Sequence, residues 1–115
     1  MKTYNSYKEL VETMRIQITT KPYRTVAALI RIYKNQLADE KKTKEVLFTN
    51  GIGFKPQDSR ILSSMAEQAI RKGTLSDKQI KCVSKLIGKY AGQLVDGSIA
   101  EGKIKKIKKG MYVVE

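Results

Sequence analysis

The chain has 115 residues, enough for one small domain with a modest core, and its hydrophobic content of 41% is ordinary for a globular protein. It carries 23 Lys and Arg against 11 Asp and Glu, a formal net charge of +12, with one cysteine and no histidine. This composition argues against an internal disulfide, a thiolate zinc site and histidine-based acid–base catalysis. We therefore expect a protein without catalytic residues, metal or cofactor.

The distribution of charge and apolar residues indicates the partner and the location. No apolar run reaches the length of a membrane span, and the first residues lack the apolar core of a signal peptide. We expect a cytoplasmic protein that does not engage a membrane. The basic residues are spread over the whole chain, so nucleic acid is the expected partner. The alternative is a ribosome-like basic protein, or one whose charge serves only solubility.

Residues 1–44 are predicted to form two helices. Ser6 and Glu9 make a capping box for the first helix, and Pro22 suits the first turn of the second. The apolar positions of the first helix are Tyr7, Leu10, Val11, Met14 and Ile18, and those of the second are Val26, Leu29, Ile30, Tyr33 and Leu37. The polar run that follows is either the solvated end of the second helix or a linker.

Residues 45–97 are predicted to form a strand, a loop and two further helices. Val46–Thr49 reads as a short strand, and Asp58 as the N-cap of a third helix that stops at Gly73. The buried face of this helix is predicted to comprise Ile61, Leu62, Met65, Ala66, Ala69 and Ile70.

The fourth helix has the strongest local signals. Ser76 and Gln79 form a capping box, and Leu75 and Ile80 stand where a hydrophobic staple needs them. Its predicted apolar face is Ile80, Val83, Ile87, Tyr90 and Leu94. Its polar face carries a lysine row, Lys78, Lys81, Lys85 and Lys89. Neighbouring lysines in such a row repel one another, which is consistent with a polyanion that binds to them. The alternative is that this helix face is merely solvated.

The predicted fold class is mainly α with a small β component. The turn Gly73-Thr74-Leu75 gives the third and fourth helices helix-turn-helix character. In the basic segment 98–115, Ile104, Ile107, Met111 and Val113 fit two strands that turn near Lys109-Gly110 and form a wing, although their spacing also fits a frayed helix. The whole chain, 1–115, is thus expected to be one winged-helix-like nucleic-acid-binding domain with extra N-terminal helices.

The loop "NGIGFKP", residues 50–56, is not a nucleotide-binding fingerprint. It lacks the Gly-Lys-Ser/Thr of a Walker A loop and the third glycine of a Rossmann turn. One interpretation is a tight turn in which Gly53 needs backbone freedom and Phe54 enters the core. Another is that free amides at the start of the third helix hold a phosphate together with Lys55 and Arg60.

Residues 50–94 carry a resemblance. The glycine–phenylalanine loop, then Asp58, then "LSDKQ" at residues 75–79 and "KYA" at residues 89–91 resemble a segment of small proteins from phages and staphylococcal cassette chromosome elements, and segments appended to some helicases. The chain most resembles the single-stranded-DNA-binding and replication accessory proteins of those elements. The resemblance implies a winged-helix-like fold in place of an OB barrel. A second small protein of the same elements partners an A-family DNA polymerase in priming.

The leading hypothesis is a non-catalytic single-stranded-DNA-binding accessory protein in replication of a mobile genetic element. Base stacking is assigned to Phe54, Tyr90 and Tyr112, with Tyr90 also a core position and Tyr4 and Tyr23 as weaker candidates. The predicted phosphate-binding residues are Lys55, Arg60, Lys78, Lys81, Lys85, Lys89, Lys103, Lys105, Lys106, Lys108 and Lys109. One alternative is a small subunit that partners an A-family DNA polymerase in priming, or a helicase, from the same element. The other is a duplex-binding helix-turn-helix regulator.

Overall fold

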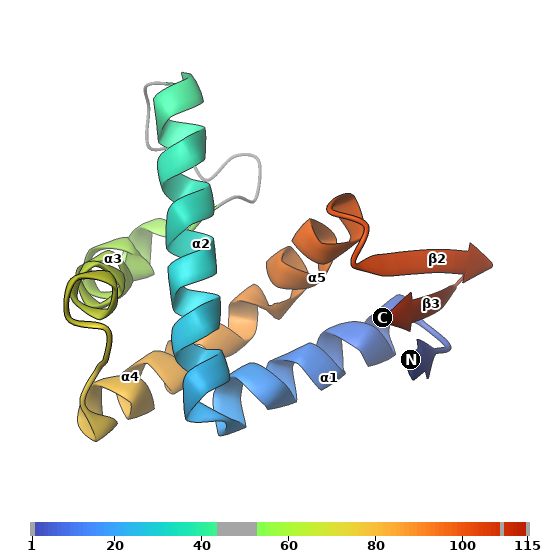
Figure 1. The fold of residues 1–115 in the computed structure, drawn as a ribbon, viewed down its shortest axis with the longest axis horizontal. Coiled ribbons are helices and arrows are strands. Elements are labelled where there is room, and N and C mark those ends of the chain that lie inside the picture. Colours follow the sequence, from blue (N-terminus) through green and yellow to red (C-terminus); the bar gives the residue numbers. More distant parts are fainter. Residues whose placement is uncertain (1, 44–52, 109, 115) are drawn as a thin grey trace.

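The computed structural model describes residues 2–43, 53–108 and 110–114 and shows a mainly helical protein with a small antiparallel sheet (Figure 1). The predicted strand Val46–Thr49 lies outside the described residues. The elements in chain order are β1 (Lys2–Tyr4), α1 (Tyr7–Thr20), α2 (Pro22–Thr43), α3 (Pro56–Lys72), α4 (Asp77–Ile87), the 3-10 turn η2 (Gly88–Tyr90), α5 (Ala91–Ala100), β2 (Ile104–Lys108) and β3 (Met111–Val114).

The first two helices begin where the sequence predicts. The Ser6 hydroxyl accepts a hydrogen bond from the Glu9 amide at 3.1 Å and caps α1. Pro22 opens α2, where its fixed φ suits the first helical position and its missing N–H leaves no donor unpaired. Among the described residues, no helix is long and apolar enough to cross a membrane.

The third helix begins earlier than predicted, and the assignment of Asp58 as its N-cap is wrong. Pro56 starts α3, and Lys55 is the N-cap residue. Asp58 lies inside the first turn with its carboxylate buried, because that carboxylate accepts hydrogen bonds from a second element rather than from its own helix end. The end of α3 is as predicted, since Gly73 adopts the left-handed conformation with φ of 78°.

The predicted fourth helix is divided into α4, η2 and α5. Its start is confirmed, because both hydrogen bonds of the Ser76–Gln79 capping box are present. The regular helix ends at Ile87, and α1 crosses closely at the next residue, Gly88. A β-carbon at Gly88 would lie 3.2 Å from the Thr19 methyl group, and the Arg15 side chain donates to the Gly88 carbonyl at 3.4 Å. The small residue therefore allows the crossing.

The C-terminal hairpin is confirmed, but it belongs to a larger sheet. β1 pairs with β3, so the strand order is β1-β3-β2, with Tyr4 opposite Tyr112 and Ile104 opposite Val114. The strand β1, which is only three residues long, was not predicted from the sequence. Ile104 is buried while Ile107 is 55% exposed, because side chains three residues apart in a strand point to opposite faces. The pairing of β2 with β3 is irregular between Lys106 and Lys108.

Two apolar clusters hold these elements together. The larger joins α1, α2, α3, α4 and η2 around Leu29, Leu62 and Val83, which are fully buried. The smaller lies under the sheet, where Leu10 and Val95 meet the strands. The predicted core positions Leu37, Ile61 and Ile70 are instead exposed at the edges of their helices. The sheet packs on α1 and α5, and Figure 1 places it at the other end of α1 from α4.

Candidate nucleic-acid interface

The lysine row of α4 is the clearest basic surface. Lys78, Lys81 and Lys85 are exposed, while Val83 and Ile87 on the opposite side of the helix are fully buried. Within the described part of the chain, no carboxylate forms an ion pair with any of these three lysines. The capping box fixes the start of α4, and the helical period places the three lysines together on the side away from the buried residues.

Lys89, the fourth lysine of the predicted row, differs from the other three because it has a carboxylate partner. Its ammonium group lies 2.7 Å from Oδ2 of Asp58, across the interface between η2 and α3. The Tyr90 hydroxyl donates to the same oxygen at 2.6 Å. Burial alone would raise the pKa of Asp58, but the hydrogen bonds from Lys89 and Tyr90 outweigh it and hold the pKa below its ordinary value. Lys89 is therefore a structural residue that keeps a buried carboxylate charged.

Further basic residues flank the turn between α3 and α4. Arg71 and Lys72 are exposed at the end of α3, before the turn, and Lys78 lies in the first turn of α4, after it. Arg71 and Lys72 were not among the site residues predicted from the sequence, and cations in a last helical turn are also expected from the helix dipole. Of the predicted residues on α3, Arg60 is exposed in the second turn, and Lys55 is half-buried at the N-cap.

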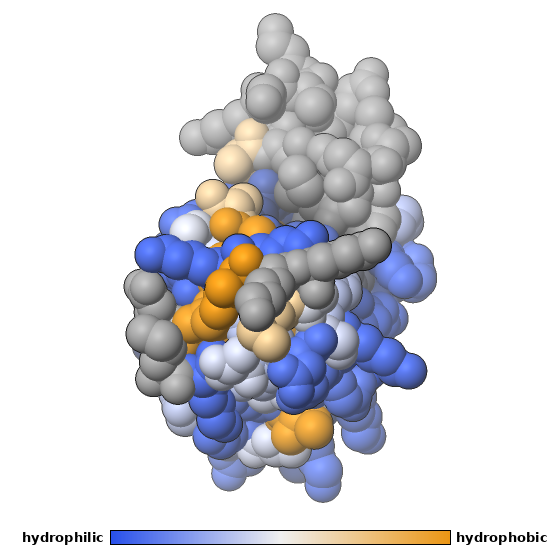
Figure 2. Space-filling model, turned by 90° about the vertical axis from the view of Figure 1, so that its right-hand side faces the viewer, coloured by the Kyte–Doolittle hydropathy of each residue, from blue (hydrophilic) through white to orange (hydrophobic). Residues whose placement is uncertain are grey.

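The C-terminal basic residues form a second, separate surface on the sheet. Lys103, Lys105 and Lys106 are exposed, and Lys103 lies 3.2 Å from a carboxylate oxygen of Glu101. Lys108 ends β2, and the predicted site residue Lys109 lies outside the described residues. Viewed from this end, the surface is largely hydrophilic with small apolar areas between (Figure 2). The two predicted lysine groups therefore do not form one continuous row.

The amides of the glycine–phenylalanine loop are already occupied by side chains. The Gly53 N–H donates to Gln93 at 2.8 Å, and the Gln93 amide group donates back to the Gly53 carbonyl at 3.0 Å. The Phe54 N–H donates to Gln36 at 2.9 Å, and the Lys55 N–H donates to the Tyr90 hydroxyl at 2.9 Å. These three loop amides are therefore not free to bind a phosphate, which argues against the interpretation of the loop as a phosphate cradle.

The aromatic residues assigned to base stacking are inside the protein. Phe54 is 3% exposed, Tyr90 2% and Tyr112 9%, so their faces are covered and the stacking assignment is wrong for all three. Phe54 and Tyr90 pack edge to face with ring centroids 5.6 Å apart. Burial and the hydrogen bond to Asp58 raise the pKa of Tyr90. The weaker candidate Tyr4 is also buried, whereas Tyr23 is 67% exposed.

Among the described residues, no cluster of three or more Cys, Asp or Glu side chains is placed to hold a metal ion. The Cys82 thiol is half-buried on α4. Comparison of the chain with protein-family models, with curated proteins and with solved structures gave no match.

Proposed function

We propose that the protein is a non-catalytic single-stranded-DNA-binding accessory protein in replication of a mobile genetic element. The observation that carries this proposal is the exposed face of α4, where Lys78, Lys81 and Lys85 stand without a carboxylate partner among the described residues. In a chain of net charge +12, such a face attracts the phosphates of a polyanion and gains from the release of their counterions.

The chemistry of this face favours phosphate contact over base reading. Lysine ammonium groups bind phosphates as point charges, whereas guanine is read best by the planar fork of arginine, which α4 lacks. Because Phe54, Tyr90 and Tyr112 are buried, we assign base stacking in this proposal to the exposed Tyr23. The family resemblance of residues 50–94 points in the same direction. A winged-helix relationship is part of the proposal, with α3 and α4 as the helix pair and β2–β3 as the wing.

We expect single strands to bind more tightly than duplex of equal length, with little dependence on sequence. The lysine face neutralises phosphates whatever the base, and unpaired bases can also stack on exposed aromatic rings. The measurement is a titration with labelled single-stranded and double-stranded oligonucleotides at two salt concentrations. Equal or tighter binding of duplex would favour the helix-turn-helix regulator, whose exposed α4 would then read a groove.

The double substitution Lys81→Ala/Lys85→Ala is expected to weaken binding of single strands without unfolding the protein. Both side chains are exposed and opposite the buried face of α4. Each lost phosphate contact should reduce the log–log salt dependence by roughly 0.7. The matched control is Lys8→Ala/Lys34→Ala, which removes the same charge from exposed positions of α1 and α2. Equal losses in the two double variants would show that only net charge matters.

A second candidate function is a small subunit of a polymerase or helicase. Its specific support is on α3, where Ile61 is 41% exposed and Ile70 48% exposed, next to basic residues. Exposed isoleucines among basic residues suit contact with a protein better than contact with phosphates. Co-purification of a replication protein through α3, lost on Ile61→Ser/Ile70→Ser, would favour this function.

A further inference from the structure

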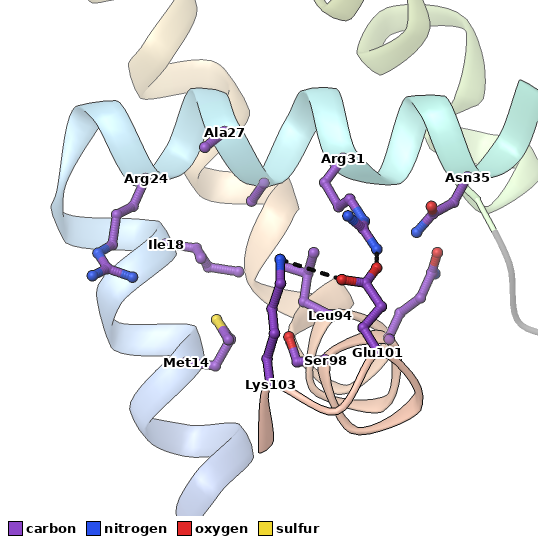
Figure 3. A pocket seen from close by; sticks show the side chains of 13 residues that line it. Met14, Ile18, Arg24, Ala27, Arg31, Asn35, Leu94, Ser98, Glu101 and Lys103 are labelled. Atoms are coloured by element: carbon purple, nitrogen blue, oxygen red, sulfur yellow. Dashed lines mark ion pairs between the residues drawn. The ribbon is translucent and has the colours of Figure 1, made fainter. Parts of the chain in front are cut away.

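A groove runs from α1, α2 and α5 to the sheet, and none of its lining residues belongs to α4. Its first part, about 290 Å³, lies between α1, α2 and α5, and its second part, about 490 Å³, continues to the sheet. The two parts share Met14, Arg24, Ser98, Glu101 and Lys103, so they lie next to each other. Figure 3 shows the α2 wall of the first part, with Arg24, Arg31 and Asn35 following one another along the helix.

The groove has an excess of positive charge. Arg24 and Arg31 come from α2, Lys103 from the opposite wall, and Lys2 from β1 at the sheet end. Glu101 is the one carboxylate among the described lining residues, and it forms ion pairs with both Arg31 and Lys103, the latter at 3.2 Å (Figure 3). A carboxylate therefore already occupies the place between two cations where an external anion would bind.

The floor of the groove is apolar and shaped by small residues. Ala27 and Ala28 lie between the two arginines of α2, and Met14, Ile18 and Leu94 line the other side. Arg24 and Arg31 are seven residues apart, or about 10 Å along the helix axis. The space between them is open because alanine side chains end at the β-carbon. A flat apolar group could lie there while both guanidinium groups remain at the rim.

We propose that this groove binds one or two nucleotide units of a single-stranded nucleic acid. A phosphate displaces Glu101 from Arg31 and Lys103, and a base lies on the apolar floor beside Ala27. Arg24 extends the contact outward, because its guanidinium lies over the ring of the exposed Tyr23, 5.7 Å from the centroid. This inference rests on the proposed function and gives it a second contact surface, distinct from α4.

A nucleic acid fits the groove better than an acidic peptide does. Phosphates recur along a nucleic-acid backbone, and cations recur along the groove from Arg31 through Lys103 to Lys2 at the sheet. Two of the five arginines of the chain line this groove, and arginine suits the planar, bidentate recognition of phosphate. Beyond the groove, the exposed lysines of β2 continue the positive surface.

The test compares charge-changing variants in the groove with a charge-matched pair outside it, using a labelled oligo-thymidine strand. Arg24→Gln/Arg31→Gln is expected to bind about tenfold more weakly than the wild type. Lys8→Gln/Lys34→Gln, which removes the same charge from exposed positions outside the groove, should show a much smaller loss. Glu101→Gln should bind roughly twofold to fivefold more tightly, because the competing carboxylate is neutralised. Thermal melts of each variant check that the fold is retained.

A variant without any charge change distinguishes binding in the groove from general electrostatic attraction to a basic protein. Ala27 is exposed, so Ala27→Leu should leave the melt unchanged while it fills the floor and weakens binding severalfold. Equal losses in the groove pair and the control pair, with Ala27→Leu and Glu101→Gln unchanged, would overturn the groove while single-strand binding stands. A wild type that binds no strand at low salt would overturn both the proposed function and the groove. Binding of a labelled ten-residue polyglutamate by a protein that binds no strand would replace nucleic acid by an acidic peptide.

Discussion

Replacing Phe54 with alanine is expected to lower the free energy of unfolding by about 3–5 kcal/mol. The ring is 3% exposed and belongs to the larger apolar cluster, where it packs edge to face on Tyr90. Its removal leaves a cavity beside the hydrogen bonds that the Tyr90 hydroxyl makes with Lys55 and Asp58. A domain of this size has about 5–15 kcal/mol of stability, so the loss is a large part of the total.

A denaturant melt beside an oligonucleotide titration measures this effect, with Tyr23→Ala as the matched aromatic control. Tyr23 is 67% exposed, so its removal should change stability by no more than about 0.5 kcal/mol. If Tyr23 stacks on bases, its removal should weaken binding by about 1–3 kcal/mol. If Phe54→Ala melts like the wild type but binds more weakly, Phe54 would be a stacking platform, contrary to its burial.

Local signals were sufficient to predict most helix ends. Ser6 and Ser76 cap α1 and α4, and Gly73 ends α3, because each of these roles depends on residues within one turn of the same helix. The C-terminal hairpin could also be predicted, since its two strands are neighbours in the chain. The strand β1 could not be predicted, because its three residues acquire strand geometry only by pairing with β3 at the other end of the chain.

Polar residues were harder to interpret than apolar ones. Asp58 has the residue type and position of an N-cap, yet its partners Lys89 and Tyr90 come from η2, more than thirty residues away. The same distant pairing took Lys89 out of the lysine row. Gln36 and Gln93 bind the loop at residues 53–54, but a glutamine in a helix gives no sequence signal for such a contact.

The candidate interface was predictable only in part. The exposed lysines of α4 follow from helical periodicity, because one helix supplies the whole row. The groove does not, since Arg24 and Arg31 meet Lys103 only when α2 packs near the end of α5. In the sequence these two arginines are separated by six residues, two of them alanines, on an otherwise ordinary helix. Their significance depends on what the fold places opposite them.

Replacing Gly53 with alanine is expected to cost about 2–5 kcal/mol, more than the same change at Gly73. Both glycines have a positive φ, 88° and 78° respectively, which costs an alanine about 1–2 kcal/mol at either position. They differ in their surroundings. A β-carbon at Gly53 would lie 2.8 Å from Cβ of Gln36, whereas one at Gly73 would meet nothing within 4 Å.

The pair of substitutions thus isolates the close approach of α2 to the loop. Gln36 is buried, and its side-chain oxygen accepts the Phe54 N–H, so any shift of Gln36 leaves that buried amide without its acceptor. Urea melts of Gly53→Ala and Gly73→Ala against the wild type measure the difference. Equal losses would mean that Gln36 moves aside freely and that the loop needs glycine only for its backbone angle. A larger loss at Gly53, with Gly53→Val worse still, would identify this loop as a packed joint between α2, α3 and α5.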